Sequence, residues 1–359
     1  MNGQRLRVGV IGAGNIATIA QLPTLVQRDD VELAALVSRR EDPGNLVRRW
    51  GFGSAYKSVE DMLNAQDLDA VFVLTPRSEH AHAVQLCLNR DVDVFCEKPP
   101  APATEEAERL ADLADERGRI LMVDFNRRYA PVYTAGREMF GAQGATFCVA
   151  QKNRPGSEYR ATFENAIHMV DLLRWYCGGE PVDVAAYATG DDPWEEDGVT
   201  AMIRFDTGNT GVLMAARTAG AWNEKLDAYG AGKTVEVRAP ETVSTTVQGV
   251  TTSRELSAEA YGWATATDTI GFSAAVHHFL DRIADRGAAP HLRSRGRSYP
   301  AVARQGPRSL RTAHRRTARP AMGKPCHQWQ QLNGKDITCL NRPSGSGPQD
   351  KHPGKEPGR

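Results

Sequence analysis

The sequence predicts an α/β protein, with a doubly wound parallel sheet at the N-terminus and then a second α/β domain with an open, mostly antiparallel sheet. Residues 1–124 alternate short apolar runs with helical patterns, as expected for parallel strands covered on both faces. A glycine-rich loop follows the first run, and beyond residue 140 the pattern changes to longer alternating strands. We therefore expect domains at residues 1–124 and 125–290, followed by a basic irregular tail at 291–359.

The parallel sheet is predicted from five apolar runs, which lie at residues 6–11, 31–37, 70–74, 92–96 and 120–123. A helix is expected between the last two, over TEEAERLADLADERG. Thr104 can cap this helix, and the two glutamates that follow suit the positive end of the helix dipole. Gly118 is expected to end it. Alternation of this kind indicates βαβ units.

The second sheet is predicted from alternating strands at residues 199–205, 210–216, 225–229, 234–237 and 243–247. The first two are joined across DTGN, a hairpin-type turn, and Gly230-x-Gly232 is expected to be another turn. Two helices are predicted, over TFENAIHMVDLLRWYCGG and over FSAAVHHFLDRIADRG. The apolar stripe expected on the first consists of Phe163, Ile167, Val170 and Leu173.

The formal net charge of zero conceals a split between the tail and the rest of the chain. Residues 291–359 hold 15 Lys and Arg against 3 Asp and Glu, which leaves 29 against 41 in residues 1–290. The tail has no sustained apolar face, so a basic nucleic-acid arm, a disordered tail and a shifted reading frame in high-GC coding sequence are the alternatives. We favour the shifted frame and expect no nucleic-acid partner.

The composition is that of a globular protein, because hydrophobic residues at 41% and charged residues at 25% are ordinary values. No apolar run reaches the roughly 18 residues of a membrane-spanning helix, and the N-terminus lacks the pattern of a secretory signal. The six cysteines are widely spaced, without a C-x-x-C pair or a Cys/His cluster at zinc spacing. We expect a cytoplasmic protein with reduced thiols, no membrane partner and no metal.

The glycine-rich loop is a candidate dinucleotide site. RVGVIGAGNIATIA places Gly12 and Gly14 directly after a strand, with Ala17 as the small third residue at the opening of a helix. The first glycine permits the tight turn, and the second lets the backbone approach a pyrophosphate. Asn15 and Ile16 lie where the helix N-terminus presents free N–H groups to phosphates. A tight turn without a ligand is the alternative.

The end of the second strand bears on the choice between NAD and NADP. An NAD site commonly carries an acid there for the ribose 2′-hydroxyl, whereas this chain has Ser38, Arg39 and Arg40, which suit a 2′-phosphate. NADP is therefore modestly favoured. The alternatives are that the two arginines form a solvated loop, or that Glu41 or Asp42 serves the ribose.

Four segments together resemble the Gfo/Idh/MocA oxidoreductases, the group of glucose-fructose oxidoreductase and inositol dehydrogenase. They are GVIGAGNIA, TPRSEH at 75–80, FCEKPPAPATEEAERL at 95–110 and VDFNRRYAP at 123–131. The resemblance implies a Rossmann domain and an α/β domain whose open sheet supplies the substrate pocket and often a dimer or tetramer interface. Members mostly move a hydride between nicotinamide and a secondary alcohol of a sugar or cyclitol.

The resemblance also implies roles for residues of the Rossmann domain. Lys98 follows a predicted strand at the carboxyl edge of the sheet, where ligands of open α/β folds bind, and in the family this lysine lies between nicotinamide ribose and substrate. Glu97 then helps the cofactor site, while Thr75 and Pro76 resemble the loop that passes the nicotinamide. Asn126 resembles a residue near the nicotinamide ring. His80 we expect to be structural.

A general base is expected on the helix at 161–177. Glu164, His168 and Asp171 share one face with Trp175, and this face is distinct from the apolar stripe. The family often has Asp-x-x-x-His-x-x-Asp here, so the resemblance makes His168 the base and Lys98 the group that polarises the substrate oxygen. Glu164 is a further catalytic candidate, although it stands where the family pattern has Asp. Asp171 is a candidate substrate ligand. An ordinary amphipathic helix with a wet polar face is the alternative.

The segment QKNRPGSEYR precedes this helix. Lys152 in it is a candidate for binding substrate hydroxyls or a phosphate, with a solvated loop as the alternative. We expect a homo-oligomeric NAD(P)-dependent dehydrogenase or reductase for a sugar, nucleotide sugar or cyclitol. A non-catalytic protein that senses a dinucleotide or a sugar is the alternative, and the presence of both Lys98 and His168 favours the enzyme.

Overall fold

Both predicted sheets are present, so the predicted fold class is confirmed. The computed structural model describes residues 5–156, 161–190, 196–256 and 265–287, all of which belong to one unit of the chain, Met1–Arg293. Expectations for the tail at 291–359 concern a part of the chain outside the described residues. The domain boundary after residue 124 stays a prediction. None of the described helices is long and apolar enough to cross a membrane.

The first sheet has six parallel strands in the order β3-β2-β1-β4-β5-β6. The strands are β1 (Leu6–Ile11), β2 (Val31–Val37), β3 (Ser54–Tyr56), β4 (Ala70–Val73), β5 (Asp93–Cys96) and β6 (Leu121–Val123). Five of them confirm the apolar runs. The sequence prediction missed β3, because a strand of three half-buried or exposed residues leaves almost no apolar signal.

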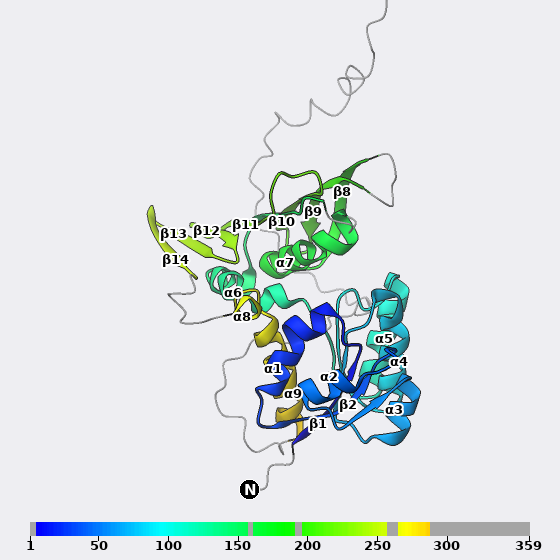
Figure 1. Ribbon diagram of the computed structural model, residues 1–359. Helices are drawn as coiled ribbons and strands as arrows, with labels where there is room; N and C mark the ends of the chain where they lie inside the picture. The colour runs from blue at the N-terminus through cyan, green and yellow to red at the C-terminus, as the bar shows by residue number, and fades with distance from the viewer. Residues whose placement is uncertain (1–4, 157–160, 191–195, 257–264, 288–359) are drawn as a thin grey trace, which may run out of the picture. The chain divides into compact units, whose positions relative to one another are not determined.

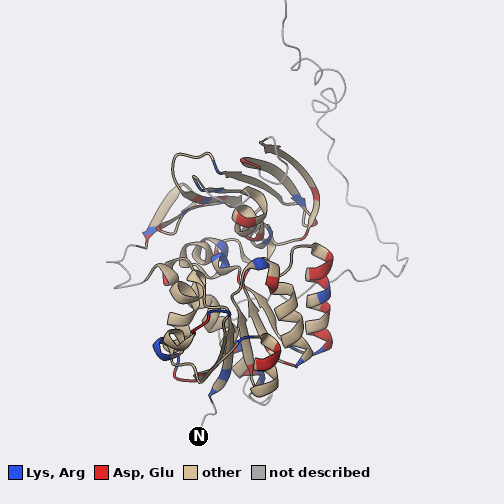
Figure 2. Cartoon of the chain, turned by 45° about the vertical axis from the view of Figure 1, so that its right-hand side comes forward, with Lys and Arg blue, Asp and Glu red and all other residues tan. Residues whose placement is uncertain are grey.

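Helices cover both faces of this sheet. They are α1 (Leu22–Val26), α2 (Gly44–Trp50), α3 (Val59–Ala65), α4 (His80–Asn89) and α5 (Thr104–Glu116), with the short turns η1 (Ala17–Gln21) and η2 (Arg77–Glu79). α3, α4 and α5 pack through one apolar cluster, and α1 and α2 through another on the opposite face. Charged residues follow one another along the ribbon of α5 (Figure 2), and Leu110 and Ala114 of this helix are buried. Thr104 is the first residue of α5 and does not cap it, since Ala103 takes the cap position.

The last helix, α9 (Phe272–Gly287), returns to the first sheet and lies beside α1 (Figure 1). Its Phe279 packs against Phe72 of β4 and Phe95 of β5, with ring centroids 5.5 Å apart in each pair. Arg286 forms an ion pair with Asp93, a buried carboxylate at the start of β5. A segment distant in sequence therefore completes the core on this face.

The second sheet has eight strands in the order β14-β13-β12-β11-β7-β10-β9-β8, and only β7 and β10 pair in parallel. The strands are β7 (Phe147–Asn153), β8 (Pro181–Thr189), β9 (Gly198–Phe205), β10 (Thr210–Ala216), β11 (Asn223–Gly230), β12 (Lys233–Ala239), β13 (Thr242–Val247) and β14 (Val250–Glu255). Five confirm the prediction, and β7, β8 and β14 were missed. Both predicted turns, over DTGN and at Gly230-x-Gly232, join antiparallel neighbours.

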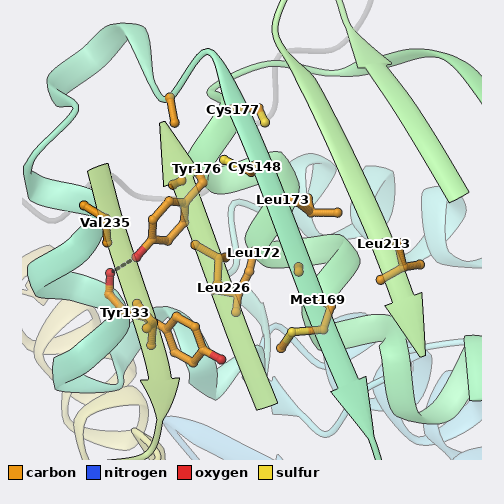
Figure 3. Close-up of a cluster of buried hydrophobic side chains, with 14 of the residues drawn as sticks. Tyr133, Cys148, Met169, Leu172, Leu173, Tyr176, Cys177, Leu213, Leu226 and Val235 are labelled. Carbon is orange, nitrogen blue, oxygen red and sulfur yellow. Dashed lines mark hydrogen bonds between the residues drawn. The ribbon is translucent and has the colours of Figure 1, made fainter. Parts of the chain in front are cut away.

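Two helices, α6 (Pro131–Glu138) and α7 (Ile167–Cys177), pack on one face of the second sheet. The remaining short elements are η3 (Asn126–Tyr129), η4 (Gly141–Gln143), the π-helical turn η5 (Ala161–Ala166) and α8 (Ala266–Thr269). Figure 3 shows the core beneath, where the hydroxyl of Tyr176 on α7 donates to the carbonyl of Tyr133 on α6 at 2.6 Å. The two helices are therefore held by this contact with each other and by their packing on the sheet.

The apolar stripe predicted for α7 is largely wrong. Met169, Leu172 and Tyr176 are the residues buried in the core with Leu173, whereas Val170 is 40% exposed. The face predicted to be polar, which carries His168 and Asp171, is buried as well. Helix α7 is thus covered on two sides, and Asp171 is buried with a charged partner, Arg128, which a count of apolar residues does not register.

Candidate functional site

The glycine loop follows β1 at the point where the strand order reverses between β1 and β4, which is where open α/β sheets bind ligands. Gly12 has a φ of +90°, and a Cβ on it would lie 2.8 Å from the carbonyl oxygen of Leu74. A Cβ on Gly14 would meet nothing within 4 Å. Ala17 is completely buried at the start of the helical segment. Packing therefore requires glycine at position 12, whereas position 14 leaves open space beside the backbone.

A pocket of about 570 Å³ lies over this loop and over the ends of β2 and β4. Its lining includes seven residues predicted for the cofactor, which are Gly12, Gly14, Ile16, Ser38, Arg39, Thr75 and Pro76. Asn15 does not line it, and the Asn15 carbonyl accepts a hydrogen bond from the Thr18 hydroxyl at 3.1 Å. The pocket also contains Lys57 and Ser58, which the sequence prediction missed.

The groups around this pocket fit a dinucleotide. The open space at Gly14 is what the close approach of a pyrophosphate requires. The Oγ1 atom of Thr75 is buried and has no hydrogen-bond partner among the described residues, so a polar ligand group can satisfy it. The helical segment after the loop begins at Asn15, so its first N–H groups lie beside the loop.

We predict opposite outcomes for alanine at the two glycines. Gly14→Ala leaves stability unchanged because the added Cβ meets nothing, yet weakens dinucleotide binding at least tenfold, since the methyl group occupies the open space. Gly12→Ala lowers the free energy of unfolding by about 1–3 kcal/mol, because the residue is strained at positive φ. Denaturant titration and nicotinamide fluorescence measure the two effects. Equal stability losses in both variants would contradict the assignment of the loop.

The far end of the pocket is basic. Arg39 has a side chain that is 70% exposed and pairs with Glu79 at 2.8 Å. The Nζ atom of Lys57 donates to the carbonyl oxygen of Glu41 at 3.2 Å and to that of Arg40. Neither alternative ribose ligand lines the pocket: the carboxylate of Asp42 accepts from the N–H of Gly44 at 2.7 Å, and Glu41 lies outside the lining.

The Lys98 turn links the first sheet to the helix of the second. β5 ends at Cys96, and the Nζ atom of Lys98 donates to the carbonyl oxygen of Glu164 in η5 at 3.0 Å. Burial lowers the pKa of Lys98, and the charge of Glu97 opposes that shift. The two ring nitrogens of His80 lie 2.7 Å from the Pro99 carbonyl and 2.8 Å from the Thr75 carbonyl. His80 thus ties two pocket loops together, as expected of a structural histidine.

His168 lies on the second residue of α7 and is buried. Its Nδ1 has no hydrogen-bond partner among the described residues, and its ring forms a T-shaped pair with the ring of Phe125, with the centroids 6.5 Å apart. Burial, and then the positive charges of Lys152, Arg127 and Lys98, hold the pKa of His168 well below its usual range. The imidazole is therefore neutral at pH 7, and the three cations that act on it come from three separate parts of the chain.

Lys152 belongs to a buried ionic cluster, not to a solvated loop. It lies in β7, and its Nζ is 3.0 Å from Oε2 of Glu224 on β11. Arg127 donates to both oxygens of Glu224, at 3.0 and 3.1 Å, and the Tyr133 hydroxyl donates at 3.0 Å. Burial lowers the pKa of Lys152 to about 7 although the charge of Glu224 opposes this shift. Sequence reasoning missed Arg127 and Glu224, which lie 97 positions apart.

Three further predicted residues already have protein partners. Glu164 is buried in η5 and forms an ion pair with Arg77. Asp171 accepts from Arg128 at 2.7 and 2.6 Å through its two oxygens. The side-chain amide of Asn126 donates to the carbonyl oxygen of Ile270 at 2.8 Å, which fixes the segment before α9. Their predicted roles toward cofactor and substrate stay predictions. Among the described residues, no three His, Cys, Asp or Glu side chains group as a metal site.

A parallel sheet in this order, with a glycine loop at its switch point, defines a dinucleotide-binding domain. Residues 6–125 match the model of an oxidoreductase family with an NAD-binding Rossmann fold, and residues 148–236 match the GFO/IDH/MocA C-terminal domain. The chain belongs to the Gfo/Idh/MocA family of oxidoreductases, as its motifs predicted.

Relatives of known sequence or structure agree with this membership. YceM of Salmonella typhimurium, which is named only as an oxidoreductase, is 30% identical over 77% of this chain and 89% of its own. Myo-inositol 2-dehydrogenase of Thermotoga maritima is 27% identical over 70% of this chain and 81% of its own. The fold is similar to that of UDP-N-acetylglucosamine 3-dehydrogenase from Acidithiobacillus ferrooxidans, with a TM-score of 0.68 and 22% sequence identity. The match covers 79% of this chain and 90% of that protein.

Proposed function

We propose that this protein transfers a hydride between NAD(P) and a secondary alcohol, or its ketone, of a sugar, nucleotide sugar or cyclitol. The observation that carries the proposal is the Lys98 contact with Glu164, because it joins the carboxyl edge of the dinucleotide-binding sheet to the helical segment that leads into His168. The names of similar proteins, which concern myo-inositol and UDP-N-acetylglucosamine, support the substrate class.

The residues divide the chemistry between them. Oxidation of a secondary alcohol removes a hydride from the carbon and a proton from the oxygen, and the nicotinamide accepts the hydride when bound. The ammonium group of Lys98 polarises the substrate oxygen and stabilises the negative charge that develops on it. The neutral imidazole of His168 accepts the hydroxyl proton. Lys152 is near its titration midpoint at neutral pH and offers a donor to neighbouring hydroxyl groups.

A non-catalytic sensor of the same fold is the second candidate. Such a protein needs the pocket over the glycine loop, but it does not need a buried amine and a buried imidazole that act on each other electrostatically. Burying cationic or titratable groups without full pairing costs free energy, and enzymes accept that cost at sites where pKa values are tuned. The presence of Lys98 and His168 in such an arrangement therefore favours the enzyme.

A panel of sugars, nucleotide sugars and cyclitols, assayed with NAD and with NADP at the nicotinamide absorbance, tests the proposal. Turnover of at least one secondary alcohol is expected. Tight dinucleotide binding without turnover of any compound in either direction would favour the sensor.

NADP is the cofactor that the basic end of the pocket favours. Arg39 is exposed at the pocket beside Arg40 and Lys57, so three cations can meet a 2′-phosphate. We predict that Arg39→Ala raises the Kd for NADP about tenfold or more and changes the Kd for NAD little. Arg48→Ala is the matched control, because Arg48 is exposed on α2 and does not line the pocket. Equal losses for both dinucleotides would contradict the 2′-phosphate role.

We also infer a homo-oligomer in the cytoplasm. On the face of the second sheet opposite α6 and α7, Met202 is 58% exposed and Met214 38% exposed, and these apolar side chains support an interface on this face. The four described cysteines are free and buried, in keeping with a reducing compartment. Light scattering measures the assembly, and a monomer at assay concentration would contradict this inference.

A further inference from the structure

Two buried carboxyl groups lie side by side at the Lys98 turn. β5 and β6 pair in parallel with Cys96 opposite Val123, so the next residue of each strand, Glu97 or Asp124, leaves the sheet at the same edge. The N–H of Asp124 donates to the carbonyl oxygen of Cys96 at 2.8 Å, which holds the second carboxyl beside the start of the turn. Asp124 and Glu97 are both buried. The strand register alone therefore creates the pair.

One amide group joins the two carboxyl groups. Nε2 of Gln21, at the end of η1, lies 2.9 Å from Oε1 of Glu97 and 3.0 Å from Oδ2 of Asp124, and donates to both. Two oxygens that accept from one nitrogen lie close together, so the two carboxyl groups act directly on each other. Two adjacent buried carboxylates repel each other, and a proton on one of them removes this repulsion. Oδ1 of Asp124 has no partner in the described part of the chain, which also disfavours a charge on Asp124.

Other titratable groups face the pair from three elements and from the turn. They are Lys98 in the turn, Cys96 in β5, His80 in α4, and Arg127 and Tyr129 in η3. Burial raises the pKa of both carboxyl groups, and the charge of Glu97 raises that of Asp124 further. The proton of the pair therefore resides mainly on Asp124, and the negative charge on Glu97, next to Lys98.

We propose that Asp124 is a positioning residue for the reaction: it shares one proton with Glu97, and the pair so formed keeps a single negative charge behind the amine of Lys98. This rests on the proposed function, which gives Lys98 its role. The single negative charge of the pair offsets the effect of burial on the Lys98 amine, so the amine stays protonated. The shared proton prevents a second charge, which would hold the ammonium group against the carboxylates and weaken its contact with a substrate oxygen.

Infrared difference spectroscopy tests the shared proton directly. The C=O stretch of a protonated carboxyl group is expected in the wild-type protein at neutral pH and is lost in D124N and in E97Q, since either substitution leaves one carboxyl that ionises beside Lys98. Asp69→Asn is the control, because Asp69 lies at the opposite edge of the same sheet, and it leaves the band unchanged. A band that persists in D124N overturns the proposal.

Titration of the Lys98 amine tests its consequence. In protein with ¹³C-methylated lysines, with the signal assigned by K98R, D124N keeps one charge and shifts the Lys98 midpoint little. The double variant E97Q/D124N lowers the midpoint by about 1–2 pH units, the shift expected when a unit charge several ångströms away is removed. A double variant with the wild-type midpoint overturns the proposal. If it fails to fold, the infrared comparison of the single variants decides.

Neither readout requires turnover, so the two proposals fail separately. A protein without dehydrogenase activity but with the shared proton and the shifted midpoint contradicts the proposed function alone. An active enzyme without the infrared band contradicts this inference alone. Where both hold, the alkaline limb of the pH profile of kcat moves down in the double variant together with the Lys98 midpoint.

Discussion

Replacing Lys98 by methionine is expected to lower kcat by about 10³-fold while dinucleotide affinity changes little. Methionine has a similar length but carries no charge, so the substrate oxygen loses the group that stabilises its developing negative charge, and removal of one such group typically costs 10²–10³. The glycine loop, which we propose to carry the dinucleotide contacts, lines a pocket that does not include Lys98. Stopped-flow or steady-state kinetics, with nicotinamide fluorescence for binding, separates the two quantities.

Lys225→Met is the matched control for this variant. Lys225 lies on β11 next to Glu224, but it belongs to the opposite face of the sheet, since buried and half-buried residues alternate along that strand. We expect its kcat to equal that of the wild-type protein. Unchanged turnover in Lys98→Met would remove Lys98 from the chemistry and leave only its contact with the Glu164 carbonyl.

His168→Ala is expected to lower kcat by about 10²–10⁴-fold, the usual contribution of a general base. The pH profile gives the sharper result. The imidazole accepts a proton only when it is neutral, so the oxidation rate falls as the pH drops through the pKa of His168. Because burial and nearby cations lower that pKa, the acid limb of the wild-type profile lies below pH 6.5. The limb disappears in His168→Ala.

His82→Ala supplies the comparison, since His82 is 71% exposed on α4 and lies outside both the pocket and the cluster. It should reproduce the wild-type rate and the wild-type acid limb. An acid limb that survives unchanged in His168→Ala would assign the base to another group. Lys152, with a pKa of about 7, is the first alternative, and an inflection near pH 7 would identify it.

The sequence predicted those parts of the fold and site that depend on local patterns. β1 and β2 have the predicted bounds because their apolar runs are continuous and end at turn residues. The glycine loop and the segments after β2 and β4 are short contiguous motifs, so seven of the predicted cofactor residues lie in one pocket, whereas Glu97, Lys98 and Asn126 do not line it. Each of these features could be predicted from the types of residue within a short stretch of sequence.

What the sequence did not predict depends on partners distant along the chain. β7 was missed because buried Lys152 breaks the apolar alternation, and its burial makes sense only with Glu224 on β11. The buried polar face of α7 likewise requires Arg128, 43 positions away from Asp171. No role was predicted for Asp124, because Glu97 lies far from it in sequence and comes next to it only through the pairing of β5 with β6.

The position of α9 has a consequence for how the chain folds during synthesis. The last strand of the first sheet ends at Val123, whereas the helix that contributes Phe279 to its core begins at Phe272. At roughly 5–20 residues per second, a ribosome needs about 7–30 s to make the intervening segment. During that interval the aromatic side chains of Phe72 and Phe95 lack their final cover, so the nascent first domain is open to chaperones and to aggregation until its own distant helix emerges.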